Sequence, residues 1–172
     1  DGLRKLVFEQ AEAFERDRMP LLSKLRQSAI HNDANDYNIL VDDADLYKNN
    51  RRVVGLIDFG DMVHSFTVAD LAVAIAYAVL DKPDPLATAA HIVSGYHEEN
   101  PINDDEIAAL FGLVCLRLWM SVCHAAHQRT QRPADDYLTV SQRPIRNTLP
   151  MLAAINPGLA EARFRQACGF SG

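Results

Sequence analysis

The sequence contains little cysteine, and its three cysteines do not have the spacing of a disulfide framework. Cys115 and Cys123 fall in one predicted helix, where a rise of about 1.5 Å per residue separates them by about 12 Å, too far for a bridge. No C-x-x-C spacing suited to zinc occurs, and Cys168 stands far from the other two in the sequence. We therefore expect a protein of a reducing compartment and predict a cytoplasmic location.

Long apolar runs and an excess of basic residues are lacking as well. We find neither a signal peptide nor an apolar run that would span a bilayer, so no membrane partner is expected. The formal net charge is −6 and no basic patch is visible, which argues against nucleic acid as a partner, because phosphate binding requires clustered lysine and arginine. The acidic balance is compatible with a cationic small molecule.

What is present is an ordinary globular composition. The chain has 172 residues, of which 48% are hydrophobic and 23% are charged, values typical of one domain with a sizeable core. No internal repeat interrupts it. We therefore predict a single domain over residues 1–172.

The apolar pattern predicts an α+β fold that is predominantly α-helical, with one small β element. Strands are expected at 39–41 and 53–57, joined by the polar segment 42–52 as a hairpin with a loose tip, which would present Asn38 and Asp58 side by side. Helices are expected over most of the remaining chain: from Leu3 to about Arg18, 21–28, 67–80, 85–99, from Asn103 or Asp104 to about His127, from Asp135 onward, from Pro144 onward, and 159–167.

Two polar segments on either side of these strands are the most informative feature of the sequence. The first, from His31 to Asn38, has the pattern H-x-D-x-x-x-x-N, and the second contains D-F-G at 58–60. This order and spacing is typical of the catalytic loop and the metal-binding loop of kinases. A solvated Asp- and Asn-rich turn is the alternative. The strand-like residues 39–41 that follow, together with the distant D-F-G, favour the catalytic interpretation.

The chemistry of phosphoryl transfer explains these residue types. It requires a carboxylate that orients the acceptor hydroxyl and takes its proton, and oxygen ligands for Mg²⁺ on the nucleotide phosphates. Asp33 is the predicted base, and Asn38 and Asp58 are the predicted metal and nucleotide-binding residues. His31 is predicted to pack and orient rather than to carry a proton. Asp61 is a candidate for a second metal contact or a substrate-amine contact, with a surface or capping role as the alternative.

The two segments resemble the C-terminal lobe of the aminoglycoside phosphotransferase and choline kinase superfamily. The run Gly55-Leu56-Ile57-Asp58-Phe59-Gly60-Asp61, followed by Asp70-Leu71-Ala72 and an Ala-rich helix, is most similar to the hydroxylysine kinase branch, over roughly residues 25–130. The resemblance implies a protein-kinase-like C-terminal lobe in which a small β-hairpin carries the catalytic and metal loops. It implies phosphorylation of a hydroxyl on a small amino alcohol by ATP or GTP with Mg²⁺, with Asp33 as base and Asn38 and Asp58 as metal ligands. Two departures are Asn32, where many relatives carry glycine, and the long polar connection 42–52.

The resemblance also implies parts that this sequence lacks. Such kinases carry an N-terminal lobe with a glycine-rich loop and a strand lysine that contact the phosphates. We find no such loop and no candidate strand before His31. We therefore expect this chain to be a C-terminal lobe that is inactive alone, with the nucleotide-binding lobe, and in this branch sometimes an aminotransferase module, as its partners in the parent protein.

Two residues have alternative interpretations. Asp70, the one charge in the apolar segment 67–80, accepts hydrogen bonds from catalytic-loop amides, completes a Thr67-x-x-Asp70 capping box, or does both. Trp119 is either a core residue, which we favour, or an aromatic wall for a substrate ammonium. Asp70 has a supporting role under both interpretations.

Two other functional classes remain open at this point. A non-catalytic kinase-like scaffold or regulator would need none of Asp33, Asn38 and Asp58, so their joint presence argues against it. A metal-dependent phosphoester hydrolase would use Asp33, Asp58, Asp61 and His64, and would turn over its substrate without a nucleotide. The acidic residue that binds the substrate amine is not identified by the sequence.

Overall fold

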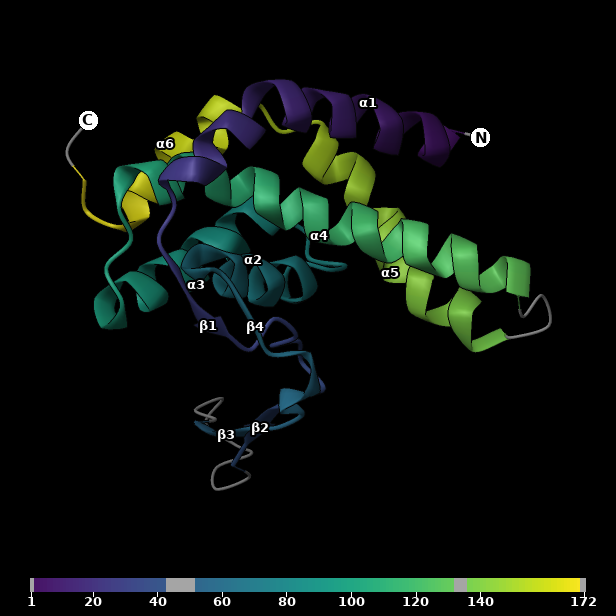
Figure 1. The fold of residues 1–172 in the computed structure, drawn as a ribbon, viewed down its shortest axis with the longest axis horizontal. Coiled ribbons are helices and arrows are strands. Elements are labelled where there is room, and N and C mark those ends of the chain that lie inside the picture. Colours follow the sequence, from purple (N-terminus) through teal and green to yellow (C-terminus); the bar gives the residue numbers. More distant parts are fainter. Residues whose placement is uncertain (1, 43–51, 132–135, 171–172) are drawn as a thin grey trace.

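The computed structural model describes residues 2–42, 52–131 and 136–170, except for the side chains of 136–141. This part of the chain contains six α-helices and four short strands (Figure 1). The elements, in chain order, are α1 Gly2–Asp17, the 3-10 helix η1 Met19–Lys24, β1 Gln27–Ile30, β2 Ile39–Val41, β3 Val53–Leu56, the 3-10 helix η2 Phe59–Asp61, β4 Val63–Phe66, α2 Thr67–Ala78, α3 Pro85–Glu99, α4 Asp104–Gln131, α5 Asp136–Ala153 and α6 Pro157–Ala167.

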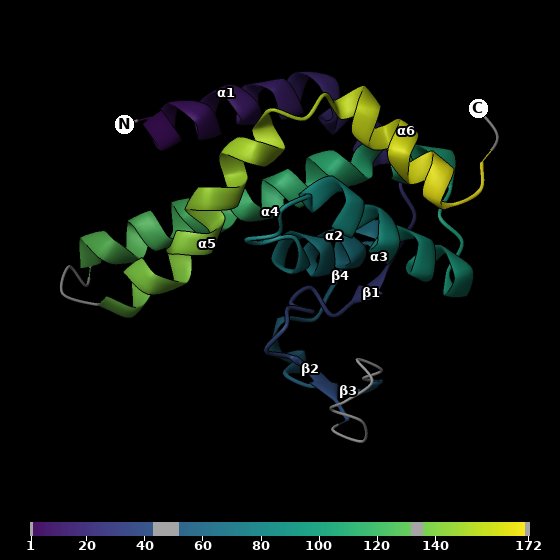
Figure 2. The same cartoon turned by 180° about the vertical axis from the view of Figure 1, so that it is seen from behind.

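Helix α4 runs through the middle of the helical body. Figures 1 and 2 both place α1 and α6 on one side of α4, and α2 and α3 on the other side. The apolar side chains of α2 and α4 meet in this core, where Ile75, Leu110 and Leu118 are 0% exposed. Their burial supplies the main favourable free energy of folding. The predicted central position of the helix at 67–80 is confirmed.

The four strands form two separate antiparallel pairs. Strand β1 pairs with β4, with Ser28 opposite Ser65, and β2 pairs with β3, with Ile39 opposite Leu56. The β2–β3 hairpin projects away from the helices, and the β1–β4 pair lies between that hairpin and the helical body (Figure 1). The loop from β1 to β2 and the loop from β3 to β4 therefore meet where the hairpin joins the body.

The segment 21–28 was predicted to be helical, which is confirmed only as the 3-10 turn up to Lys24 and is wrong for residues 27 and 28. The 3-10 helix η1 ends at Lys24, and Gln27–Ile30 form β1, so a strand precedes His31 and the fold has two β elements. Only Ile30 in this strand is buried, so the apolar alternation that marks a strand in a sequence is missing. The extended conformation of β1 depends on its pairing with β4, which a local pattern does not contain.

Most other predicted elements are confirmed. The helix at 85–99 and the strand at 39–41 have the predicted bounds, and the second strand ends one residue early, at Leu56. Helix α4 continues past His127 to Gln131. Helix α5 is one helix that contains Pro144 and Pro150, rather than two segments. The predicted loose tip of the hairpin, residues 43–51, lies outside the described residues.

The expectation that no apolar run is long enough to span a membrane is wrong when only length and composition are considered. Within the described ranges, α4 alone is long and apolar enough, and half of its most apolar stretch is buried inside the protein. The core helix of a globular fold satisfies the same criterion. The prediction of unbridged cysteines is confirmed: Cys115 is buried and Cys123 is exposed.

Candidate active site around Asp33

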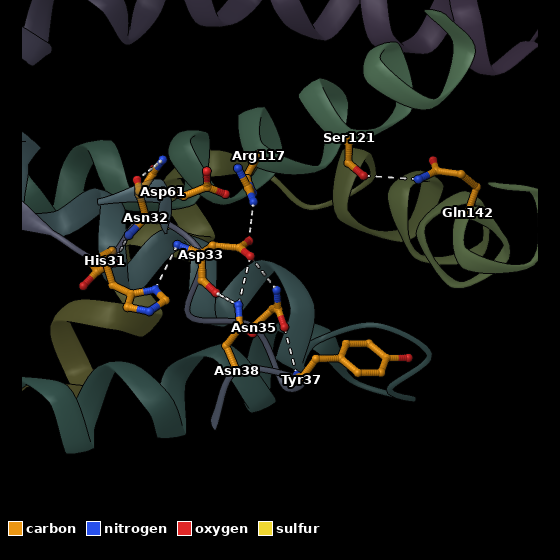
Figure 3. A network of polar contacts seen from close by, with 11 residues as sticks. His31, Asn32, Asp33, Asn35, Tyr37, Asn38, Asp61, Arg117, Ser121 and Gln142 are labelled. Atoms are coloured by element: carbon orange, nitrogen blue, oxygen red, sulfur yellow. Dashed lines mark hydrogen bonds and ion pairs between the residues drawn. The ribbon is translucent and has the colours of Figure 1, made fainter. Parts of the chain in front are cut away.

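The carboxylate of Asp33 is held by three side chains from two elements (Figure 3). Asn35 and Asn38, in the β1–β2 loop, donate their amide N–H groups to Oδ2, each at 3.0 Å. Arg117, on α4, donates from Nη2 to Oδ1 at 2.8 Å. These three hydrogen bonds therefore fix the orientation of both carboxylate oxygens.

Asn38 folds the loop back onto Asp33. Its amide nitrogen also donates to the backbone carbonyl of Asp33 at 2.8 Å, and its side chain is only 8% exposed. Because both side-chain hydrogen bonds of Asn38 use the amide nitrogen, its Oδ1 remains as an acceptor. Two residues that are five positions apart in the sequence are thereby brought into contact.

The backbone conformation of Asn32 explains why asparagine can stand where many relatives carry glycine. Its φ is 65°, in the left-handed region that glycine adopts freely and that asparagine tolerates better than most residues. Its backbone N–H donates to Oδ1 of Asp70 at 2.8 Å. The left-handed turn thus aims this N–H at α2.

Asp70 makes the contact that the first of its two interpretations requires. The capping-box alternative is wrong, because the N-cap of α2 is Phe66, which makes no side-chain cap, and the Thr67 hydroxyl instead contacts that of Ser28 at 2.9 Å. The carboxylate of Asp70 is therefore used across the fold, between α2 and the catalytic loop.

His31 links the two loops. Its Nδ1 accepts a hydrogen bond from the backbone N–H of Asp33 at 3.3 Å, so its proton is on Nε2, which donates to the carbonyl of Ile57 at 2.9 Å. The ring is 5% exposed and lies edge-on to Phe59, with ring centroids 5.0 Å apart. The backbone N–H of Ile57 in turn donates to the carbonyl of Asn38 at 3.0 Å. These contacts bring Asp58, the next residue, to the same end of the hairpin as Asn38.

Asp58 and Asp61 lie on the exposed surface of the second loop. Asp58 has a φ of 63° and forms the N-cap position of η2 without a side-chain cap. Asp61 contributes its backbone carbonyl, which accepts from the Asn32 amide at 3.4 Å. Amide and carboxylate oxygens such as those of Asn38 and Asp58 are the donor types that Mg²⁺ takes, commonly one or two protein groups together with substrate phosphates.

The hydrolase alternative requires a larger ligand cluster. Among the described residues, no group of three or more His, Cys, Asp and Glu side chains is placed to hold a metal ion. His64 lies on β4, paired with Ala29, and is exposed. The arrangement does not bring it together with Asp33, Asp58 and Asp61 as one metal site.

An open cavity of about 930 Å³ lies beside the β1–β2 loop. It is lined by Asp36 from the loop, by Tyr77 in the last turn of α2 and Asp81 just after that helix, by Ser121 and His124 on α4, and by Gln142 on α5, among others. Gln142 is 7% exposed, and its Nε2 donates to Ser121 at 3.2 Å while its Oε1 has no partner (Figure 3). An acceptor molecule of metabolite size fits a cavity of this volume.

Arg117 and Gln142 are the site residues that sequence reasoning missed. A charged residue within the apolar helix α4 is a signal that could have identified Arg117, since arginine is seldom buried unless it is paired. Trp119, two residues further on, is 5% exposed and packs edge-on against Phe14, so its interpretation as a core residue is confirmed.

Comparisons with known proteins agree with the family resemblance. The model of the phosphotransferase enzyme family matches residues 2–110. Hydroxylysine kinase of Mus musculus is 32% identical over 143 residues, which cover 81% of this chain and 38% of that protein. Hydroxylysine kinase of Danio rerio is 30% identical over 170 residues, which cover 97% of this chain and 47% of that protein. No solved structure gives a significant match.

The chain therefore spans less than half the length of these curated relatives. The family match covers the β1–β2 loop with Asp33, the second loop with Asp58, and helices α2 and α3. The chain belongs to the phosphotransferase enzyme family, in the hydroxylysine kinase branch of the aminoglycoside phosphotransferase and choline kinase superfamily.

Proposed function

We propose that this chain is the catalytic part of a small-molecule kinase that transfers the γ-phosphate of ATP or GTP to a hydroxyl of an amine-bearing metabolite similar to hydroxylysine. The supporting observation is the Asp33 carboxylate in a member of this family: it lies in the loop that borders the cavity and accepts from two loop asparagines and from Arg117 on α4. The names of the relatives support the acceptor class.

Asp33 acts as the base in this proposal. It orients the acceptor hydroxyl and takes its proton while the acceptor oxygen bonds to the γ-phosphorus and the bond from that phosphorus to the bridging oxygen breaks. The nucleoside diphosphate leaves with the electron pair of the broken bond. Asn38 Oδ1 and the Asp58 carboxylate would hold Mg²⁺, which neutralises phosphate charge when bound. His31 and Asp70 keep the loops in place.

The cavity beside the loop is the proposed acceptor site. Its lining offers the carboxylates of Asp36 and Asp81 and the unpaired Oε1 of Gln142, all of which attract a cation. Lys82 is the only lysine or arginine in the described lining. This balance supports an ammonium-bearing acceptor, because an ammonium ion donates hydrogen bonds and accepts none.

The rest of the parent protein is proposed to supply the nucleotide-binding lobe. Exposed apolar side chains gather on the hairpin and the adjoining loops, where Tyr37 is 83% exposed, Val53 69% and Val54 60%. Surfaces of this kind commonly mark an interface. We expect the N-terminal lobe to cover them, and the isolated chain to lack kinase activity.

The test is release of nucleoside diphosphate by the full-length protein. ATP and GTP are each combined with hydroxylysine, choline, ethanolamine, homoserine and an aminoglycoside. We expect release that depends on one of these acceptors. Phosphoester turnover without a nucleotide would instead support the hydrolase. Nucleotide binding without release for any acceptor would contradict the kinase proposal and favour a regulatory role.

Two variants separate the proposed roles. Asp33→Asn is expected to lower kcat by about 10²–10⁴-fold, the usual contribution of a general base, with nucleotide affinity retained. Asp58→Ala is expected to lose affinity for the Mg²⁺ nucleotide. Asp104→Asn, at an exposed carboxylate on α4, is the control and should match the wild type. Normal turnover in Asp33→Asn would remove Asp33 as the base.

A further inference from the structure

Arg117 connects the candidate base to the wall of the acceptor cavity. Its guanidinium group donates to Asp33 at 2.8 Å across 84 residues of sequence, and the same group lies over the ring of Tyr77, 5.6 Å from the ring centroid. Ser121 lies four residues after Arg117 and His124 seven residues after it, so the three residues lie on one face of α4. Ser121, His124 and Tyr77 all line the cavity. Arg117 thus contacts one residue of the cavity wall, Tyr77, and shares a helix face with two others.

The three donors to Asp33 differ in what they can fix. Asn35 and Asn38 belong to the same loop as Asp33, so they set its side-chain conformation within the loop. Arg117 belongs to α4, and it is the donor that fixes the carboxylate relative to the cavity wall. An in-line transfer depends on that relation, because the acceptor hydroxyl must meet the base and the γ-phosphorus together.

The ion pair between Arg117 and Asp33 lacks the features of a pair that mainly stabilises the fold. Its Nε is buried and has no hydrogen-bond partner, which is unfavourable for a group that forms hydrogen bonds readily. The side chains of Arg117 and Asp33 are also partly exposed, at 24% and 21%. A residue that keeps an unpaired buried donor next to a candidate base is better explained by a role in positioning that base.

We propose that Arg117 is the positioning residue of Asp33, and that it fixes the carboxylate relative to the helix α4 wall of the neighbouring acceptor cavity so that a bound hydroxyl is aligned with it. The proposal rests on the proposed kinase function. It assigns no proton transfer to Arg117, which acts through Asp33.

The test is a double-mutant cycle in the full-length protein, measured as transfer of a radiolabelled γ-phosphate to the acceptor. Arg117→Gln is expected to lower kcat by about 10²-fold, the scale of a misplacement of about 1 Å, while the KM for the nucleotide stays within about twofold. Arg117→Lys should recover part of the loss, because lysine keeps the charge and lacks the planar fork of donors. In the Asp33→Asn background, Arg117→Gln should have an effect of less than about threefold, since the residue it positions is already inactive.

Controls and contrary outcomes distinguish this proposal from the kinase proposal. Arg165→Met removes another arginine ion pair, to Asp104 at 2.6 Å, far from the loop in the sequence, and should leave kcat unchanged. An Arg117→Gln enzyme with wild-type kcat would overturn the positioning role, and so would full additivity with Asp33→Asn, which would mean that Arg117 acts on the substrate itself. If Arg117→Gln does not fold, Arg117→Lys with a native melting temperature carries the test: lowered kcat supports the role, and wild-type kcat overturns it. A wild-type protein without acceptor-dependent release would instead refute the kinase function.

Discussion

Replacing Arg26 with methionine is expected to lower the free energy of unfolding by about 3 kcal/mol, because it leaves a buried carboxylate without its cationic partner. Glu106, in the first turn of α4, is 0% exposed. Its carboxylate accepts from Arg26 at 2.8 and 2.7 Å and from the backbone N–H of Asn103 at 3.0 Å. Hydrogen bonding to Glu106 raises the pKa of the Arg26 guanidinium above its usual value, which keeps Arg26 charged.

The magnitude follows from how much of this pair is buried. Removing one partner of a fully buried ion pair costs about 3–5 kcal/mol. The Arg26 side chain is 46% exposed, so solvent screening places the expected loss at the lower end of that range. The Asn103 N–H is the one other donor that the structure records for this carboxylate. Arg26 also precedes β1 directly, so the pair ties the strand that leads into the catalytic loop to α4.

The assay is urea unfolding followed by circular dichroism, with Arg165→Met as the control. Arg165 pairs with Asp104 in the same turn of α4 and with Glu161 on α6, but the Asp104 carboxylate is 69% exposed, so a clearly smaller loss is expected than for Arg26→Met. The double variant Arg26→Met/Glu106→Leu should recover much of the loss, because no unpaired charge is left buried. Equal losses for Arg26→Met and Arg165→Met would refute the reasoning.

Two further predictions concern the loop support and the thiols. Asp70→Asn should lower kcat by about 10-fold or more with a small change in stability, because the N–H of Asn32 loses a charged acceptor, one worth about 1.5–3 kcal/mol; steady-state kinetics within twofold of the wild type would contradict this role. Burial raises the pKa of the Cys115 thiol to about 12, so at pH 8 a thiol reagent should label exposed Cys123 in the native chain and reach Cys115 only after unfolding. Because the unfolded thiol ionises at lower pH than the folded one, the contribution of Cys115 to stability is complete below about pH 9 and declines as pH rises toward 12. Cys115→Ala should remove this part of the alkaline decline in urea unfolding, and native labelling of Cys115 would show that it is accessible.

Local patterns were sufficient for the elements whose signals lie within a few residues. The apolar run at 67–80 predicted a buried helix, and Pro85 and Asn100-Pro101 bracketed α3. The β2–β3 hairpin was predicted by β-branched residues at both strands. In contrast, β1 has the sequence Gln27-Ser28-Ala29-Ile30, without such a signal, and it was missed because its partner β4 begins more than thirty residues later.

The sequence by itself determined the chemistry of the candidate site, because the spacing from His31 to Asn38 and the D-F-G at 58–60 specify which functional groups each loop carries. Which other groups meet those loops was decided by the tertiary structure alone. Arg117 reaches Asp33 from a helix 84 residues away, and the cavity beside the loop is enclosed by parts of α2, α4 and α5. Such contacts arise when apolar helix faces pack into one core, and their partners have no fixed separation along the chain.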